Sequence, residues 1–184
     1  MSDRLDPRDL FRGQWKVLTL RTSNSTRADV VIRAVVYLVP LALGVVAGVS
    51  GFALKSPDAL LAGLALLVGG MLAVFAQIAV WRERLTDRER LFAESEASDR
   101  DSLDEAVTNV LVAAFWSVVG IVAIIVGQST SNATDGSLGG WACGIVVAVG
   151  AHVAILFMLV IFKLYDSYLY INKVSDRLNG SVRD

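Results

Sequence analysis

Four long stretches of apolar residues divide the chain, and nearly all charged residues fall between them. The stretches cover residues 30–54, 58–81, 106–127 and 140–162. A helix needs about 20 predominantly apolar residues to cross the hydrocarbon core of a bilayer. The pattern therefore predicts an all-α integral membrane protein, a bundle of four transmembrane helices arranged as two antiparallel hairpins.

Short polar signals indicate where these helices begin. Ser56 and Pro57 precede the second stretch, as an N-cap followed by proline at the first helical position. Residues 26–29 and 102–105 match the capping box that starts many helices, here the first and third. The few residues between the first two stretches predict a tight hairpin, whereas the polar loop 128–139 joins the last two.

The polar segment 1–29 contains a candidate amphipathic helix over residues 7–20. Such a helix can lie in the membrane interface, with basic groups near anionic lipid headgroups. The alternative is an ordinary soluble helix packed on the loop 82–105. Headgroup and interface positions are predicted here and at the ends of the spans: Arg8, Arg12, Trp15, Lys16, Trp81, Tyr165 and Tyr168.

Lysine and arginine are distributed unevenly between the two sides. Six lie in residues 1–29, five in the charged loop 82–105 and four in residues 163–184, which read as a helical extension. The turn after residue 54 contains only Lys55, and the loop 128–139 contains none. The positive-inside rule then places both termini in the cytoplasm. The composition, with 13 arginines and 4 lysines, suggests a bacterial inner-membrane protein.

Composition and charge exclude several kinds of partner and covalent link. The chain has 184 residues, is 54% hydrophobic and carries a net charge of −1, with a mean hydropathy of +0.56. This charge argues against a nucleic-acid partner, which normally meets a basic surface. The single cysteine, Cys143, excludes an intrachain disulfide. No signal peptide is visible in residues 1–29, so the first span is expected to be retained.

Small residues recur every four positions in several spans. They let helix backbones approach closely in lipid, either within one bundle or between subunits. The second span has Ala65, Gly69 and Ala73 at this spacing. The pattern predicts a homo-oligomer whose helices pack through the following positions of the first and fourth spans: Gly44, Gly48, Gly51, Gly140, Gly144 and Ala148.

His152 is the only histidine, and it falls near the middle of the fourth span. An ionisable group at this depth is a functional candidate. The alternative is a neutral imidazole that bonds to a neighbouring helix. Pro40, Gly69, Gly70 and Ser117 lie at about the same depth in the other spans. Helix breaks that meet at the midplane are typical of transporters and channels, although such residues are frequent in membrane helices generally.

The catalytic candidates are few. Ser117 and His152 could form a serine-protease pair, but Ser117 lacks the flanking glycines that expose such a nucleophile. The four predicted spans contain no aspartate or glutamate except Asp58, the first residue of the second span. Cys143 lies nine residues before His152, too far along a helix for both to bind one metal ion. The sequence therefore predicts no enzyme, cofactor or metal site.

Three functions remain open. The leading hypothesis is a non-enzymatic oligomer that forms a pore, behaves like a channel or otherwise perturbs the membrane. It rests on the small-residue faces, the irregular midplane positions and the absence of a catalytic set. The second is a membrane adaptor that docks a cytoplasmic protein on its charged segments. The third is a small-solute transporter that uses His152.

Overall fold

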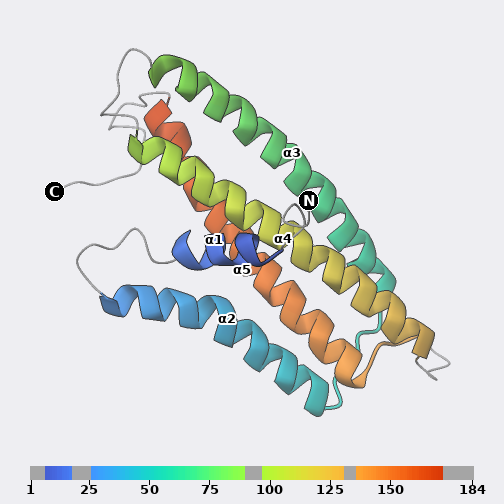
Figure 1. Ribbon diagram of the computed structural model, residues 1–184. Helices are drawn as coiled ribbons and strands as arrows, with labels where there is room; N and C mark the ends of the chain where they lie inside the picture. Colours follow the sequence, from blue (N-terminus) through green and yellow to red (C-terminus); the bar gives the residue numbers. More distant parts are fainter. Residues whose placement is uncertain (1–6, 18–25, 90–96, 131–135, 172–184) are drawn as a thin grey trace.

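The protein is an all-α membrane protein. The computed structural model describes residues 7–17, 26–89, 97–130 and 136–171. They form five helices (Figure 1): α1 (Pro7–Val17), α2 (Thr26–Val49), α3 (Pro57–Glu89), α4 (Ala97–Thr130) and α5 (Gly140–Ile171). Four of these, α2 to α5, are long and apolar enough to cross a membrane.

The helix boundaries follow from local chemistry. Helix α3 begins at Pro57, where the missing N–H of proline costs no helical hydrogen bond. Helix α2 ends at Val49, before the predicted Leu54. Gly51 follows with a φ of +72°, a conformation that glycine adopts without the steric cost of a Cβ.

The predicted capping box at residues 102–105 is wrong. Helix α4 begins at Ala97, so residues 102–105 lie inside the helix and cannot act as a capping box. Residues 97–101 are mostly polar and include neither glycine nor proline, so the helix can extend beyond the apolar stretch. Helices α3 and α5 likewise run past their apolar stretches, to Glu89 and Ile171.

The four long helices pack as a row, in which the consecutive helices α4 and α5 of the second predicted hairpin lie side by side. Helix α2 packs on α5, α5 on α4, and α4 on α3. The predicted tight hairpin between the first two spans is not confirmed, because the backbones of α2 and α3 do not pack on each other in the described residues. Although only a short turn joins α2 to α3, α2 lies beside α5 (Figure 1). The small residues of α2 pack against α5.

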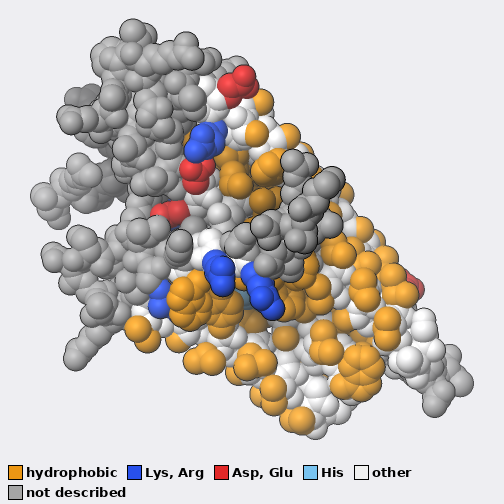
Figure 2. Space-filling model, in the orientation of Figure 1, with side chains coloured by type: hydrophobic (Ala, Val, Ile, Leu, Met, Phe, Trp, Pro, Cys, Tyr) orange, Lys and Arg blue, Asp and Glu red, His pale blue; other side chains and the backbone are white. Residues whose placement is uncertain are grey.

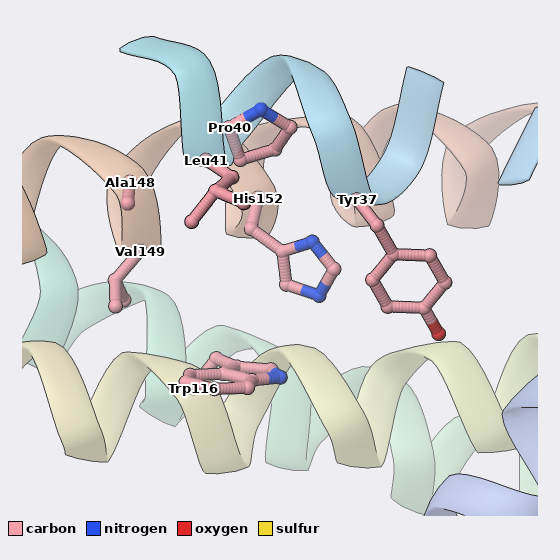
Figure 3. Close-up of a pocket in the computed structure, with 7 residues that line it drawn as sticks. All are labelled: Tyr37, Pro40, Leu41, Trp116, Ala148, Val149 and His152. Carbon is pink, nitrogen blue, oxygen red and sulfur yellow. The ribbon is translucent and has the colours of Figure 1, made fainter. Parts of the chain in front are cut away.

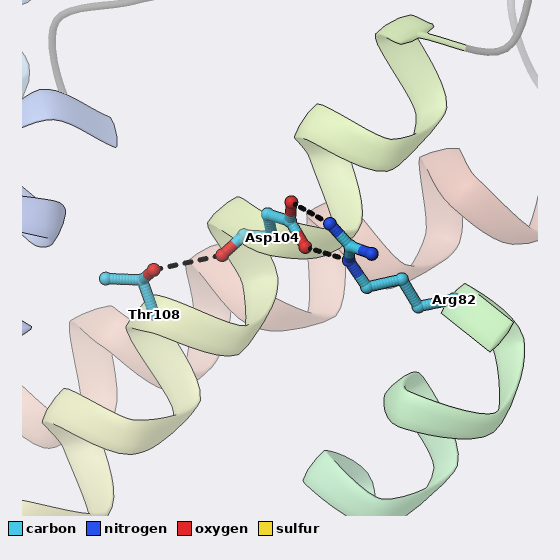
Figure 4. A network of polar contacts seen from close by, with 3 residues as sticks. All are labelled: Arg82, Asp104 and Thr108. Carbon is cyan, nitrogen blue, oxygen red and sulfur yellow. Dashed lines mark hydrogen bonds and ion pairs between the residues drawn. The ribbon is translucent and has the colours of Figure 1, made fainter. Parts of the chain in front are cut away.

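The long helices have chemically different surroundings at their two ends. At one, here called the bridge end, Leu54 and Leu138 exchange two backbone hydrogen bonds of 2.9 Å and join the two connections. At the other, the charged end, Arg82 of α3 binds Asp104 of α4 through two hydrogen bonds of 2.6 and 3.0 Å (Figure 4). An ion pair between Lys163 and Glu105 joins α5 to α4 there. Hydrophobic side chains cover much of the intervening surface (Figure 2).

Gly120 of α4 lets three helices meet in the core. A Cβ added at this glycine would lie 3.0 Å from Leu64 of α3 and 3.0 Å from Val149 of α5. The absence of a side chain therefore allows residues of both neighbouring helices to reach α4. This packing holds α3, α4 and α5 together, while α2 stays at the edge of the row, attached through α5.

Candidate functional site

His152 is anchored to a proline-induced gap in the hydrogen bonding of α2. Pro40 has no N–H, so the carbonyl of Val36, four residues earlier, has no helical partner. The Nδ1 of His152 lies 2.9 Å from that carbonyl oxygen. Since a carbonyl only accepts, Nδ1 carries the hydrogen, and in the neutral ring Nε2 is then an acceptor. The hydrogen bond links α5 to the irregular point of α2.

Two aromatic rings hold the imidazole in place. Tyr37 of α2 stacks on it with ring centroids 5.6 Å apart, and Trp116 of α4 meets it edge-on at 5.7 Å. Figure 3 shows the imidazole of His152 between these two rings. The side chain of His152 is only 7% exposed, and its buried Nε2 has no hydrogen-bond partner. The site thus contains one oriented acceptor.

A cavity of about 300 Å³ adjoins this ring. We call it the His152 cavity, and its lining comes from α2, α4 and α5 (Figure 3): Tyr37, Pro40, Leu41, Trp116, Ala148, Val149 and His152. Four of the lining side chains are purely hydrocarbon, and the hydroxyl of Tyr37 points to another partner. The cavity is consequently apolar, with a single histidine at one side.

Helix α1 bridges α2 and α4 beside this cavity. Gln14 is fully buried and accepts a 3.1 Å hydrogen bond from the hydroxyl of Tyr37 on α2. Phe11 packs edge-on against Phe115 and Trp116 of α4, with centroids 5.5 and 6.4 Å apart. The backbones of α2 and α4 do not pack on each other in the described residues, and α1 lies between them (Figure 1). These side chains of α1 therefore connect the two spans.

A second contact of α1 lies closer to the charged end of α2. The guanidinium of Arg33 lies 4.4 Å from the ring centroid of Trp15, a cation–π geometry. Its Nε and Nη2 atoms are buried without a hydrogen-bond partner. Trp15 also lies 6.2 Å from the ring of Tyr37. One face of α1 therefore packs on α2 and α4, and Arg8 and Arg12 are exposed on the same helix.

Glycines bring α2 and α5 into backbone contact. A Cβ added at Gly44 would lie 2.6 Å from the Gly144 carbonyl oxygen and 2.6 Å from the Cβ of Ala148. A Cβ added at Gly144 would lie 2.7 Å from the Gly44 carbonyl oxygen, and Gly48 packs on the same seam. These small residues are therefore used within one chain. Gly51 and Gly140 have open space around them and φ values of +72° and +60°.

A second cavity continues along the same seam toward the bridge end. It has a volume of about 370 Å³ and shares Leu41 and Ala148 with the His152 cavity. We call it the seam cavity; its remaining lining residues are Gly44, Val45, Gly48, Val49, Trp141, Gly144 and Ile145. Leu41, Val45 and Trp141 are 57–60% exposed, so this cavity opens sideways onto the apolar surface.

The other midplane candidates do not join His152. Ser117 is fully buried, and its hydroxyl donates to the Ala113 carbonyl one turn earlier at 2.8 Å, as serines commonly do in helices. Gly69 and Gly70 lie exposed on α3, with nothing within 4 Å of an added Cβ. The structure therefore brings together Pro40 and His152 only.

The predicted interface residues occupy different environments. Trp81 is half-buried and packs against the core, whereas Tyr165 and Tyr168 are about half exposed on α5. Trp15 is 52% exposed despite its contact with Arg33. The side chain of Lys16 lies outside the described residues, as does the part of the predicted helical extension that follows Ile171.

Sequence reasoning missed several polar residues of this region. Gln14 sits in an amphipathic helix, where a glutamine is usually assigned to the solvent side. Tyr37 appears as one more aromatic residue in an apolar span. Glu105 seemed to be a capping residue, yet it is 6% exposed and pairs with Lys163. The spacing of Gln14 from Phe11, three residues along α1, was the available signal that both share one face.

The described residues include no group of three or more histidine, cysteine, aspartate or glutamate side chains suited to a metal ion. The site instead consists of one anchored imidazole, two aromatic rings and an apolar cavity, with helix α1 packed beside it. Comparison of the chain with protein-family models, with curated proteins and with solved structures finds no match.

Proposed function

We propose that the chain is a non-enzymatic bacterial inner-membrane protein that forms a pore or channel-like assembly, and that α1 holds this assembly closed. One observation carries the proposal. The buried Gln14 of α1 binds Tyr37 of α2, while Phe11 of α1 packs on α4. In the described residues, a short amphipathic helix therefore links two spans whose backbones do not pack on each other.

Buried polar groups on α1, α4 and α5 support a closed pathway. Glu105 and Asn109 are buried on α4, and Gln14 and His152 are buried on α1 and α5. Asn109 Oδ1 and Gln14 Nε2 have no hydrogen-bond partner. An unpaired buried polar group costs about 1–3 kcal/mol, so hydration of these atoms favours a state in which α1 has moved away. The packing of Phe11 and Gln14 opposes that movement.

One chain supplies only part of a pathway. Beyond His152, toward the bridge end, the seam between α2 and α5 is lined by apolar residues and glycines. A row of four helices also has too few walls to enclose water. Several copies are therefore required, with the buried polar groups of α1, α4 and α5 facing a shared centre.

The edges of the row offer surfaces for such an assembly. Only 22% of the most apolar stretch of α2 and 11% of that of α3 is buried, against 44% for α4 and 33% for α5. On α3, the exposed positions include Ala65, Gly69 and Ala73, a spacing that permits close helix contact. The α3 edge of one copy can associate with the α2 edge of the next. Such contacts close a ring when the rotation between successive copies returns to the first copy.

The proposed orientation places the charged end in the cytoplasm, in accordance with the lysine and arginine distribution. Helix α1 then lies on the cytoplasmic side, with Arg8 and Arg12 exposed near the lipid headgroups. Its release by a cytoplasmic signal would open the assembly. The same orientation leaves the charged ends of α3 and α5 available to a cytoplasmic partner.

Membrane potential in bacteria tests the proposal. The chain is expressed under an inducible promoter and read with a voltage-sensitive dye, at matched amounts in the membrane. Gln14→Ala removes the side chain that fastens α1, so we expect stronger depolarisation than with the native chain. Gln128→Ala is the control, because Gln128 contacts Asp58 at the bridge end. Equal potentials for both variants and the native chain would contradict the proposal.

A further inference from the structure

We infer that the His152 cavity binds a lipid-soluble molecule of the phenol class, an aromatic hydroxyl on an apolar body, whose hydroxyl donates to Nε2 of His152. The inference goes beyond the proposed function and does not depend on it. A protein that forms no pore could still bind such a molecule from the bilayer.

The first argument is the unpaired acceptor. Nδ1 of His152 is fixed as a donor by the Val36 carbonyl, so Nε2 of the neutral ring must accept. Nε2 has an accessible area below 1 Å² and no hydrogen-bond partner, so a donor in the cavity reaches it when the imidazole or a lining side chain shifts. In Figure 3 the Nε2 edge of the ring faces away from α2, toward α4. A ligand that donates one hydrogen bond removes this deficit.

A water molecule fits the cavity less well than such a ligand. A buried water typically needs two to four polar partners. Pro40, Leu41, Ala148 and Val149 supply none through their side chains, and the Tyr37 hydroxyl donates to Gln14. A water could therefore pair at most with His152 and the indole N–H of Trp116, and it would leave the apolar remainder of the cavity empty. A molecule with a single donor and an otherwise apolar body matches the lining better.

The aromatic walls select the shape of that body. Tyr37 and Trp116 flank His152 from two different helices. Aromatic rings pack favourably on one another edge-on or offset, so a planar ring is the preferred occupant. The cavity volume of about 300 Å³ is at the lower end of the range of small-molecule sites. It therefore suits a single ring with its hydroxyl rather than a bulky headgroup.

The seam cavity provides room for an apolar tail and a way in. It adjoins the His152 cavity at Leu41 and Ala148, and it opens sideways where Leu41 is 59% exposed. A tail there would lie against Leu41, Val45 and Ile145, on the outer side of the seam where the α2 and α5 backbones touch. An acyl chain alone would fill the seam but leave Nε2 unpaired, and a carboxylate brings an acceptor where a donor is needed.

Because the chain has a single histidine, the NMR signals of a histidine label report on this site alone. The full-length protein is labelled with ¹⁵N-histidine, placed in phosphatidylcholine nanodiscs and followed by NMR while 4-octylphenol is added. The matched control is 4-octylanisole, which has the same body but a methyl ether in place of the donor. We expect a saturable upfield shift of the Nε2 signal with the phenol. The affinity for the ether should be at least about tenfold weaker, since one hydrogen bond to a buried acceptor is missing.

Leu41→Trp separates binding in the cavity from general partition into the bilayer. Its side chain is exposed, so the larger ring can occupy the cavity mouth without disrupting the core. We expect this variant to keep the Nδ1 signal of the anchored ring and lose the response to the phenol. The inference is overturned by equal shifts with phenol and ether, by an unchanged response in Leu41→Trp, or by no saturable shift.

Discussion

His152 of α5 donates a hydrogen bond from Nδ1 to the Val36 carbonyl of α2, across 2.9 Å. Pro40 leaves this carbonyl without a helical partner, and the histidine replaces the missing donor. A polar group in lipid must be satisfied within the protein, because no water can take its place. The relationship explains how a proline and a histidine can both lie inside apolar spans.

Replacement of His152 should therefore depend on residue 40. His152→Ala leaves the Val36 carbonyl unpaired, and we expect a loss of about 1–3 kcal/mol in the free energy of unfolding. In a Pro40→Ala background the new N–H of residue 40 can bond the carbonyl, so the same substitution should cost less. A double-mutant cycle measured by unfolding in detergent tests this coupling. Equal costs in both backgrounds would show that the hydrogen bond is not formed.

Replacement of a glycine by alanine should destabilise the protein inside the α2–α5 seam but not on the exposed surface of α3. Gly44→Ala places a methyl group 2.6 Å from both Gly144 and Ala148, so the two helices must move apart. Overpacking of this kind costs about 1–3 kcal/mol. Gly70→Ala is the matched control, because an added Cβ there meets nothing within 4 Å. Thermal unfolding in detergent should show a clear loss for the first and none for the second; equal effects would place the seam elsewhere.

The four spans could be predicted from sequence because each is a long apolar run, but their neighbours could not. In lipid, an apolar side chain is tolerated on any face, so hydrophobicity does not reveal which side of α2 meets another helix. Gly44 and Gly144 were visible as small residues in separate spans. Only their close contact shows that the faces belong to one chain, with α2 beside α5 rather than α3.

The candidate site was predictable only in part for a similar reason. Depth counting aligned Pro40 and His152 with Ser117, Gly69 and Gly70, since all five lie near the middle of a span. Depth along a helix does not define the direction of a side chain. Ser117 bonds its own helix, and Gly69 and Gly70 face outward on α3. Gln14 was missed because its burial arises from docking of α1 on other helices.

The two ion pairs at the charged end should differ in their contribution. Lys163→Met leaves the carboxylate of Glu105 buried, with a side chain only 7% exposed, and should cost about 3 kcal/mol of stability. Asp104→Asn breaks the pair with Arg82, whose two side chains are 44% and 50% exposed, and should cost less than about 1 kcal/mol. Unfolding in detergent measures both. A larger cost for Asp104→Asn would reverse this ranking.

Docking of α1 should depend on Tyr37 as well as on Gln14. Tyr37→Phe keeps the ring but removes the hydroxyl, which leaves the Gln14 Oε1 buried without its donor. We expect faster hydrogen exchange of the α1 backbone amides, by about fivefold to a hundredfold. Ser129→Ala is a suitable control, since its hydroxyl bonds only within α4. Unchanged exchange in α1 of Tyr37→Phe would mean that this contact does not hold the helix.

A reversible disulfide between α1 and α4 tests the central claim most directly. A Cβ added at Gly13 lies 3.5 Å from the side chain of Thr108, so cysteines at both positions are within reach of each other. The pair is introduced together with Cys143→Ala and the opening substitution Gln14→Ala, and potassium efflux from liposomes is measured. We predict that the oxidised protein retains potassium and that the reduced protein releases it. The same efflux in both states would contradict closure by α1.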